Sequence, residues 1–468
     1  MKKLTTIIFS ILTILTIPVM GQVEYTQYTK AEIEQDLTFA FETLISIHPL
    51  FLDNDQLIHF QNQFSKIEKS IKDNMTQNEV FLLLAPLFAS LNDGHTGIIV
   101  PTDQRIEFTK AGGKSFPFFV NIVDDSIYVS FYCGNDTTLF QKDDQLLKIN
   151  GIKATKIIHD MESLFSGKAP KIRQKAIADK FRFLIWMLYG FNEDYNLTIK
   201  NNDNDIIEMT IPGISSTEFK QNIKRMPKTN LCDFALDIDL NKSTAVMKIK
   251  SFRDLDGFCL FADSAFANLK TNKIKNLVLD IRDNFGGRSV VVDSLMNYLT
   301  DKPYMQYKKI EVRISPELKE HYKKRYPHRL DWINKYSIDD NVVIDHNIRE
   351  TRNKNNRFDG NLFLLTNSSS FSAAATFAGV FKKLKLGTII GEETGGTIAY
   401  YGDFWFLNTP NSNIKFYVSP KRFIQYGGEE YNRGVIPDHI VHDKKSSIVE
   451  FANDIIEQKQ GNAKILYK

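Results

Sequence analysis

The chain has few of the residues that mark metal-binding, nucleic-acid-binding or disulfide-rich proteins. Its 468 residues include only three cysteines, Cys133, Cys232 and Cys259, so at most one disulfide can form within the chain. No pair of cysteines has the CxxC spacing and no histidine-rich run accompanies them, so neither a metal nor another cofactor is predicted. The formal net charge is +3, without a strongly basic segment, and nucleic acid is therefore not an expected partner.

Long apolar runs are missing beyond the N-terminal segment. Residues 1–21 combine Lys2 and Lys3 with an apolar stretch that ends at Pro18, which is the pattern of a secretory signal peptide. Cleavage before Gln22 would leave a mature chain without a membrane span, so we expect an exported protein in the periplasm or outside the cell. The alternative is a retained anchor, although the apolar stretch is short for a spanning helix.

The length of the chain predicts more than one domain, because 468 residues are too many for a single hydrophobic core. Residues 22–112 carry apolar residues at helical spacing, and residues 113–225 are rich in strands at both ends. Residues 226–445 alternate strand and helix, which predicts a largely parallel sheet with helices on both faces. Residues 446–468 read as a C-terminal helical tail. We therefore expect an α/β multidomain protein.

Residues 366–375 are the most informative stretch. They follow the apolar run 362–365 and precede an apolar helical pattern, so a strand, a tight turn and a helix are predicted. A serine in such a turn has its hydroxyl at the mouth of a sheet, and the N–H groups of the next helix point at whatever that hydroxyl attacks. Ser372 is therefore the candidate nucleophile. The alternative is that these serines are ordinary turn and N-cap residues.

Two further segments offer the other parts of a nucleophilic site. Residues 276–287 read as a buried strand that ends in a polar turn with Gly286 and Gly287, and such a turn can present free N–H groups to an anion. Residues 91–97 close a helical region with His95 between two glycines. Together the segments predict a nucleophile, an oxyanion site and a general base.

The order of these motifs resembles peptidase family S41, the tail-specific or C-terminal-processing proteases and their tricorn-like relatives. Five motifs occur in the family's order: DGHT around His95, LDIRDNFGG, the SFSAA turn around Ser372, IIGEETGG, and GVIPD at 434–438. The similarity extends from about Tyr28 to His442. It implies an N-terminal helical unit, a PDZ-like β-rich domain and a ClpP/crotonase-like α/β catalytic core.

The β-rich domain carries one family feature of its own. Residues 142–152 resemble the GDxILxING segment of PDZ-like domains, with Asp143 in place of the usual glycine. PDZ-like folds bind an extended peptide as an added strand, so the resemblance implies a reader of polypeptide C-termini. The alternative is an unrelated small β-domain. Residues 304–355 match no family motif and read either as a surface excursion over the cleft or as a solvated helix.

Relatives differ in the group that activates the serine. One branch uses a serine–lysine dyad, but Thr397 stands at or next to the lysine position here. Lys382 and Lys383 lie on the helix after the nucleophile and are not placed to reach Ser372. The tricorn-like branch uses an N-terminal histidine, which His95 matches, and imidazole has a pKa suited to base catalysis near neutral pH.

In those relatives a carboxylate shortly before the GVIPD run orients the histidine. The resemblance puts Tyr431 at that position, so Glu430, one residue away, is the predicted orienting residue if the loop is shifted. Glu429 is an alternative, and both could form a solvated acidic turn. Tricorn-like relatives also carry a serine before the histidine, where this chain has Gly94. Asp93 is expected to shape the loop rather than to take part in the chemistry.

The function predicted from these residues is a secreted serine endopeptidase acting on unfolded or C-terminal polypeptide segments. Ser372 would attack the peptide carbonyl, His95 would move the proton, and the N–H of Ala373 with that of Gly286 or Gly287 would hold the oxyanion. Two alternatives stay open: a peptide-binding protein of the same fold without turnover, and a hydrolase of small esters.

Overall fold

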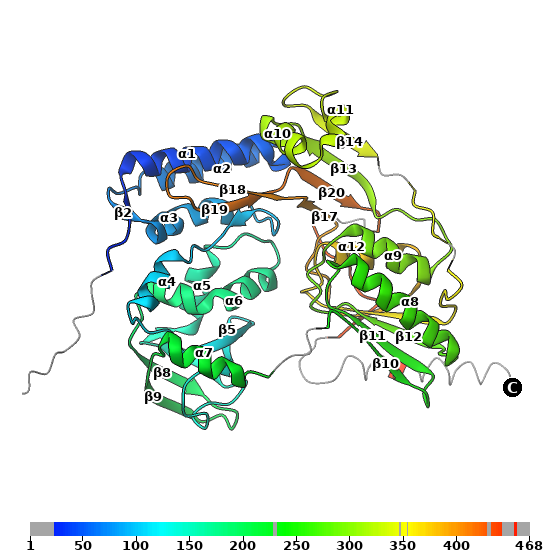
Figure 1. Ribbon diagram of the computed structural model, residues 1–468, viewed down its shortest axis with the longest axis horizontal. Coiled ribbons are helices and arrows are strands. Elements are labelled where there is room, and N and C mark those ends of the chain that lie inside the picture. Colours follow the sequence, from blue (N-terminus) through cyan, green and yellow to red (C-terminus); the bar gives the residue numbers. More distant parts are fainter. Residues whose placement is uncertain are drawn as a thin grey trace, which may run out of the picture.

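The computed structural model describes residues 23–227, 232–345, 348–352, 354–427, 432–441 and 454–455. Helices run along the top of the view in Figure 1, a β-rich unit hangs below them, and an α/β unit lies beside it. None of the helices in these ranges combines the length and the apolarity needed to cross a lipid bilayer. The predicted N-terminal segment, residues 1–21, and most of the predicted C-terminal tail lie outside the described residues.

The N-terminal unit is helical, as the apolar spacing predicted. Its long helices are α1 (Lys30–Ile47), α2 (Asn54–Glu68) and α3 (Gln77–Ala89), and α1 and α3 each begin with a Thr–Glu capping box. Their apolar faces are buried in one cluster. The shorter elements of this unit are β1 (Gln27–Tyr28), η1 (Pro49–Leu52), β2 (Met75–Thr76), β3 (Gly97–Ile98) and α4 (Asp103–Lys110).

The β-rich unit is an antiparallel sheet in the order β4-β5-β6-β8-β9, with the short β7 paired to β6. An isolated bridge between Ser115 and Ile214 brings its two edges together at one corner. Two helices, α5 and α6, pack on this sheet (Figure 1), and both lie between β7 and β8 in the sequence. The bounds are β4 (Phe118–Val123), β5 (Ser126–Tyr132), β6 (Gln145–Ile149), β7 (Ile152–Lys153), α5 (Ala154–Glu162), α6 (Pro170–Tyr189), β8 (Asp194–Lys200), β9 (Ile206–Pro212), α7 (Ser216–Asn222) and η2 (Ile223–Arg225).

The α/β unit is built on a sheet in the order β10-β11-β12-β15-β16-β21. Only the β10–β11 pair is antiparallel, and the other neighbours are parallel, as the alternation of strand and helix predicted. The carboxyl ends of β12 and β15 therefore lie side by side. The elements are β10 (Phe234–Asp239), β11 (Thr244–Ile249), α8 (Leu255–Thr271), β12 (Asn276–Asp280), α9 (Ser289–Leu299), β15 (Asn361–Thr366), α12 (Ala373–Lys383), β16 (Gly387–Gly391) and β21 (His439–Ile440).

Helices α8, α9 and α12 of this unit pack against one face of the sheet. The prediction of helices on both faces is tested on this face only, because most of the C-terminal segment lies outside the described residues. Side chains such as Leu277 and Leu279 share one cluster with α8, α9 and α12. Their strand neighbour Val278 points the other way, into a separate cluster with Phe363 and Ile455 from the C-terminal segment. Both faces of the sheet are apolar because both are buried. An apolar strand does not show which kind of element packs on each face.

Residues 304–355 form part of a second sheet with a core of its own. The strand order is β14-β13-β20-β17, and Val312, Leu318 and Ile333 are buried against it. This segment is therefore more than a solvated helix. Its elements, with the two strands that complete the sheet, are β13 (Tyr307–Arg313), α10 (Pro316–Arg325), η3 (Pro327–Arg329), α11 (Leu330–Ile333), β14 (Asn341–Asp345), β17 (Ala399–Gly402) and β20 (Lys421–Gln425).

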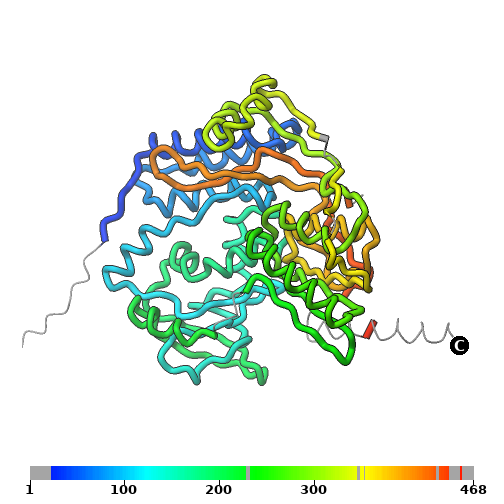
Figure 2. Tube along the Cα trace, turned by 45° about the vertical axis from the view of Figure 1, so that its right-hand side comes forward, coloured from blue at the N-terminus to red at the C-terminus, as the bar shows by residue number. Residues whose placement is uncertain are grey.

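A hairpin from the C-terminal half packs on the N-terminal helices. Its strands β18 (Trp405–Asn408) and β19 (Lys415–Val418) continue into β3 as one small sheet, and Figure 2 shows the orange segment running along the blue helices. The buried Asp36 carboxylate on α1 accepts the backbone N–H groups of Asn411 and Ser412, both at 2.8 Å. This hairpin fixes the start of β3, and with it the loop that carries His95.

Candidate active site

Ser372 is the first residue before α12, in the turn that follows β15. Its backbone has φ 53° and ψ −123°, a conformation that non-glycine residues rarely adopt and that other contacts must hold. Its hydroxyl makes no capping bond to the helix. The alternative that Ser372 serves as an N-cap therefore does not describe its side chain, which is free to contact other groups.

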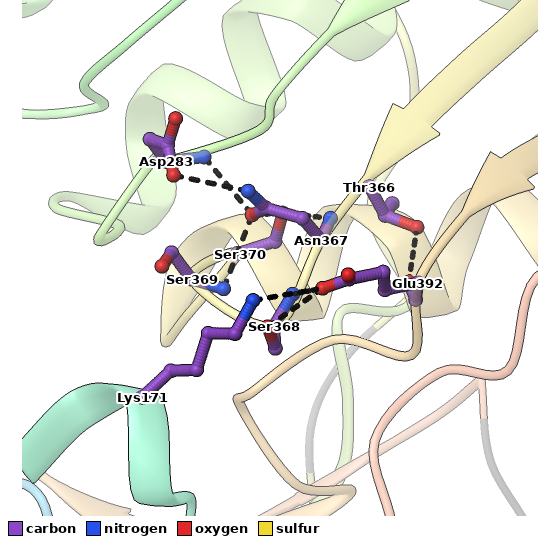
Figure 3. A network of polar contacts seen from close by, with 8 residues as sticks. All are labelled: Lys171, Asp283, Thr366, Asn367, Ser368, Ser369, Ser370 and Glu392. Carbon is purple, nitrogen blue, oxygen red and sulfur yellow. Dashed lines mark hydrogen bonds and ion pairs between the residues drawn. The ribbon is translucent and has the colours of Figure 1, made fainter. Parts of the chain in front are cut away.

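Other serines in the same turn have structural contacts. Ser370 Oγ donates to the Ile281 carbonyl at 2.9 Å and accepts the Asn367 N–H at 3.1 Å. Asn367 Nδ2 in turn donates to Asp283 Oδ1 at 3.0 Å (Figure 3). These bonds join the turn after β15 to the turn after β12, so the two predicted halves of the site are held as one piece.

A carboxylate supports the turn from the opposite side. Glu392, in the loop after β16, accepts the N–H of Ser368 at 3.2 Å and its hydroxyl at 2.8 Å, both through Oε2. Lys171 Nζ, at the start of α6, lies 3.5 Å from the same oxygen (Figure 3). Burial alone would raise the pKa of Glu392, but the Ser368 bonds and the Lys171 charge outweigh it and lower the pKa. The β-rich unit thus contacts the turn of the candidate nucleophile.

His95 lies in the loop between α3 and β3, and its ring reaches Ser372. Nε2 of His95 is 3.1 Å from Oγ of Ser372, a hydrogen-bond distance between residues 277 positions apart in the chain. The ring stacks on Phe371, with the ring centroids 4.8 Å apart, and on Tyr400 at 5.5 Å. Ser419 Oγ donates to the His95 carbonyl at 2.8 Å, which ties the loop to the strand after the hairpin.

The His95 imidazole is neutral at neutral pH. The side chain is buried, and the loss of water lowers its pKa below the usual 6.5, although the charges of Asp93 and Asp403 partly oppose this. In the tautomer that carries its proton on Nδ1, Nε2 accepts the hydrogen bond of the Ser372 hydroxyl. The pair therefore has the protonation that a general base needs.

Asp93 lies on the other side of the His95 ring. Its Oδ1 accepts the backbone N–H of His95 at 3.0 Å and is 3.9 Å from Nδ1. Its Oδ2 lies 3.3 Å from Nε2 of His48, a fully buried side chain at the end of α1. Burial would raise the pKa of Asp93, but the hydrogen bond and charge of His48, with those of His95, lower it overall. Asp93 is therefore a buried anion.

The two glycines after β12 differ in what their N–H groups contact. The Gly286 N–H donates to Asn284 Oδ1 at 2.8 Å, so it is already engaged. Over the described ranges, the N–H groups of Gly287 and Ala373 have no acceptor in the protein. A Cβ on Gly286 would lie 2.7 Å from Ser372 Cβ and 2.8 Å from the Ala373 nitrogen. Gly286 thus leaves room for the nucleophile, while Gly287 and Ala373 carry the free donors.

The remaining predicted positions fall elsewhere. Glu429 and Glu430 lie outside the described residues, so the prediction that Glu430 orients His95 stays a prediction. Thr397, at the lysine position of the dyad branch, bonds to the Ala399 carbonyl at 2.7 Å, and Lys382 Nζ donates to the Ile436 carbonyl. At Gly94, a Cβ would lie 2.7 Å from the Phe371 ring, so the serine of tricorn-like relatives would not fit there without a shift.

A cavity of about 990 Å³ opens over Ser372 and His95. Side chains from β18, β19 and α9 line it together with the catalytic-pair candidates, and several are aromatic or aliphatic. They include Phe285, Val290, Phe404, Phe406 and Tyr417. Phe404 and Phe406 are 43% and 50% exposed, which is high for such side chains and marks a surface suited to contact with another molecule.

Reasoning from the sequence missed the contact of His48 and Asp93. The signal was present, because an aspartate two residues before a loop histidine can accept that residue's N–H in an Asx turn. The fold adds what the sequence lacks, since His48 comes from α1 and reaches Asp93 across 45 positions.

The chain is similar to a known peptidase family over part of its length and to solved peptidase structures. The model of peptidase family S41 matches residues 243–441. The crystal structure of mature CPAF has a TM-score of 0.63 at 14% identity, covering 88% of this chain and 92% of that chain. CPAF complexed with lactacystin gives 0.63 at 15%, covering 88% and 94%.

The photosystem II D1 C-terminal processing protease is similar to the chain as well, with a TM-score of 0.47 at 13% identity, over 91% of this chain and 97% of that chain. The two CPAF structures show the same fold at low identity. The family match identifies residues 243–441, which include Ser372 and four of the five motifs, as a region of peptidase family S41, a family of serine peptidases.

Proposed function

We propose that this peptidase cleaves polypeptide chains through an acyl-enzyme, with Ser372 as the nucleophile and His95 as the general base. The observation that carries the proposal is the 3.1 Å contact between Ser372 Oγ and His95 Nε2 beneath a cavity of about 990 Å³. The lowered pKa of His95 supports it, because the ring is neutral and can accept a proton.

The steps follow from the positions of these atoms. Ser372 Oγ attacks the peptide carbonyl carbon while its proton passes to His95 Nε2, and a tetrahedral oxyanion forms. His95 then returns the proton to the leaving nitrogen, the C–N bond breaks, and the acyl group stays on Oγ. Water then attacks the ester while its proton passes to His95, the bond between the acyl carbon and Oγ breaks, and His95 returns the proton to Ser372 Oγ as the acid is released.

The oxyanion would be held by the N–H groups of Gly287 and Ala373. Both lack an acceptor within the described chain, and Ala373 begins α12, whose N-terminal end favours negative charge. Gly286 would leave space rather than donate. The role of Glu430 as an orienting residue remains part of the proposal.

The substrates would be unfolded or C-terminal polypeptide segments. The size and apolar wall of the cavity support an extended peptide with large side chains rather than a small ester. In the β-rich unit, β4 is an edge strand, and a PDZ-like domain would bind a peptide C-terminus along such an edge. We also propose export, with residues 1–21 removed and no membrane span in the mature chain.

Digestion of an unfolded model protein tests the proposal, with Ser372→Ala and His95→Ala variants as matched controls. Peptide products from the wild type that are absent with both variants would support it. Tight binding of the unfolded chain without cleavage would favour the peptide-binding alternative. Turnover of a small ester without peptide cleavage would favour the esterase.

A further inference from the structure

The Nδ1 side of His95 contains a buried carboxylate that the proposed chemistry has not used. For a triad-like base, the ring nitrogen away from the nucleophile needs a group that accepts its proton's hydrogen bond or stabilises the imidazolium. Among the described residues, His95 Nδ1 has no hydrogen-bond partner. The nearest acidic oxygen is Asp93 Oδ1, at 3.9 Å.

We infer that Asp93 is the positioning residue for His95, held in place by His48, and that it stabilises the imidazolium formed during catalysis. The inference rests on the proposed function. At 3.9 Å the Asp93–His95 side-chain contact is charge–charge and not a hydrogen bond. Such contacts are often long in an unliganded site and shorten when the ring becomes charged.

The contacts of Asp93 fix the direction of its carboxylate. The backbone N–H of Leu50 donates to His48 Nδ1 at 3.1 Å, so His48 carries its proton on Nε2 and donates it to Asp93 Oδ2 at 3.3 Å. The other oxygen is held by the backbone N–H of His95 at 3.0 Å. Because both carboxylate oxygens of Asp93 are hydrogen-bonded, its Oδ1 is held beside Nδ1 of His95.

The role of Asp93 differs from that of the other acidic group near His95. Asp403 also favours a charged His95, but its side chain is 58% exposed and its Oδ2 pairs with Lys421 Nζ at 2.6 Å. Its effect is therefore screened by water and by a neighbouring cation. Asp93 is 4% exposed, and over the described ranges its ion-pair contacts are with His48 and His95 alone.

The remaining titratable neighbours do not change charge while His95 titrates. Burial raises the pKa of the phenols that line the cavities beside His95, so they stay neutral; they are Tyr307, Tyr400, Tyr401 and Tyr417. Arginine and lysine side chains keep one charge in this pH range. Those lining the cavities beside His95 are Lys168, Arg253, Arg329, Arg349 and Arg422.

The test is the pH profile of fluorophosphonate labelling for the wild type and for Asp93→Asn. Without the carboxylate, the imidazolium loses its stabilising charge, so the midpoint of the profile should move to lower pH. The plateau rate should fall by about ten-fold or more, within the range for a disturbed general base. A role in loop shape alone would lower the amount of labelled protein and leave the midpoint where it is.

Two further variants keep the test decisive. Asp403→Asn removes the same charge from a screened position, so its midpoint should move less than that of Asp93→Asn. His48→Leu leaves Asp93 and His95 intact but removes the donor to Oδ2, and its midpoint should move in the same direction as for Asp93→Asn, by less. It decides the question if Asp93→Asn does not fold.

An unchanged midpoint in both Asp93→Asn and His48→Leu overturns the inference. So does a midpoint that moves in Glu430→Gln and not in Asp93→Asn, because Glu430 would then be the orienting group. A wild type that is folded and takes no label at all would instead contradict the proposed function, so the two failures are distinct.

Discussion

At the scale of single residues, the serines in the turn before α12 differ in what they contact. Ser368 and Ser370 bond to neighbouring side chains and backbone, whereas Ser372 points at His95 from a strained backbone. Strain of this kind persists only where the surroundings fix it, and here the bonds of Asn367 and Glu392 do so. The site therefore depends on residues that never touch a substrate.

The lowered pKa of His95 predicts the pH dependence of labelling. A general base is active when neutral, and burial holds the His95 pKa below 6.5. The fluorophosphonate labelling rate should therefore stay at its plateau at neutral pH and fall only below pH 6.5. Rate constants measured across the acidic and neutral range check this, with His95→Ala as the variant that should lose the pH-dependent rate. A midpoint clearly above 6.5 would contradict it.

Gly286→Ala should abolish most labelling. The added methyl would lie 2.7 Å from Ser372 Cβ and 2.8 Å from the Ala373 nitrogen, so the nucleophile and a proposed oxyanion donor must both shift. We expect a loss on the order of 100-fold, as for removal of one oxyanion donor. Gly151→Ala is the matched control, because Gly151 also has a positive φ, +79°, but nothing within 4 Å of the new methyl. Equal effects of both substitutions would point to backbone strain alone.

The sequence identified the residues of the proposed chemistry, but not the residues that hold them in place. The motif order was enough to select Ser372 and His95 as a pair, and the structure places them 3.1 Å apart. It could not choose between Gly286 and Gly287, because the choice depends on whether the Asn284 side chain folds back onto one N–H. Asp93 was assigned to loop shape for a similar reason, since its partner His48 is remote in the chain.

At the scale of elements, the hairpin β18–β19 places the His95 loop. Register pairs Tyr417 with Gly97 and Phe416 with Ile98, so β3 begins next to this hairpin. Residues 405–418 fall within the predicted unit 226–445, whereas in space the hairpin packs on the N-terminal helices. Contacts between distant segments leave no local pattern, which is why this part of the fold could not be predicted.

Asp36→Ala should destabilise the protein and loosen this hairpin. The substitution leaves the N–H groups of Asn411 and Ser412 without their acceptor in a buried place. The loss of charge-assisted hydrogen bonds should lower the free energy of unfolding by about 3 kcal/mol, measured by denaturant titration. Glu34→Ala on the same helix removes a half-exposed carboxylate paired with Lys30 at 3.6 Å and should change the free energy of unfolding by less than about 0.5 kcal/mol. A loss from Asp36→Ala no larger than this control would contradict the assignment.

In the contact between α6 and the turn of Ser372, we expect Glu392 to matter more than Lys171. Glu392→Ala removes the acceptor of two Ser368 bonds and should slow labelling by about ten-fold, since a lost bond to a charged group is worth about 1.5–3 kcal/mol. Lys171→Met removes a half-exposed ion pair at 3.5 Å and should change the rate by less than about two-fold. Labelling rates of the two variants measure this. A larger effect of Lys171→Met would mean that α6 controls the turn.

At the scale of the whole molecule, the candidate site is assembled from distant parts. His95 follows the N-terminal helices, and Ser372 directly precedes α12 of the α/β unit. Helix α6 of the β-rich unit contacts Glu392, which supports the turn of Ser372. The fold class and the parallel sheet followed from the alternation of strand and helix in the sequence. Which face α8, α9 and α12 cover did not, because the strands are buried and apolar on both faces.

The most direct test of the account is to label the purified protein with a fluorophosphonate and locate the adduct by mass spectrometry of its peptides. We expect one adduct, on Ser372, which is absent from Ser372→Ala and much slower to form in His95→Ala. Circular dichroism of both variants would show that they are folded. An adduct on another serine, or no adduct on the folded wild type, would contradict the central claim that His95 activates Ser372.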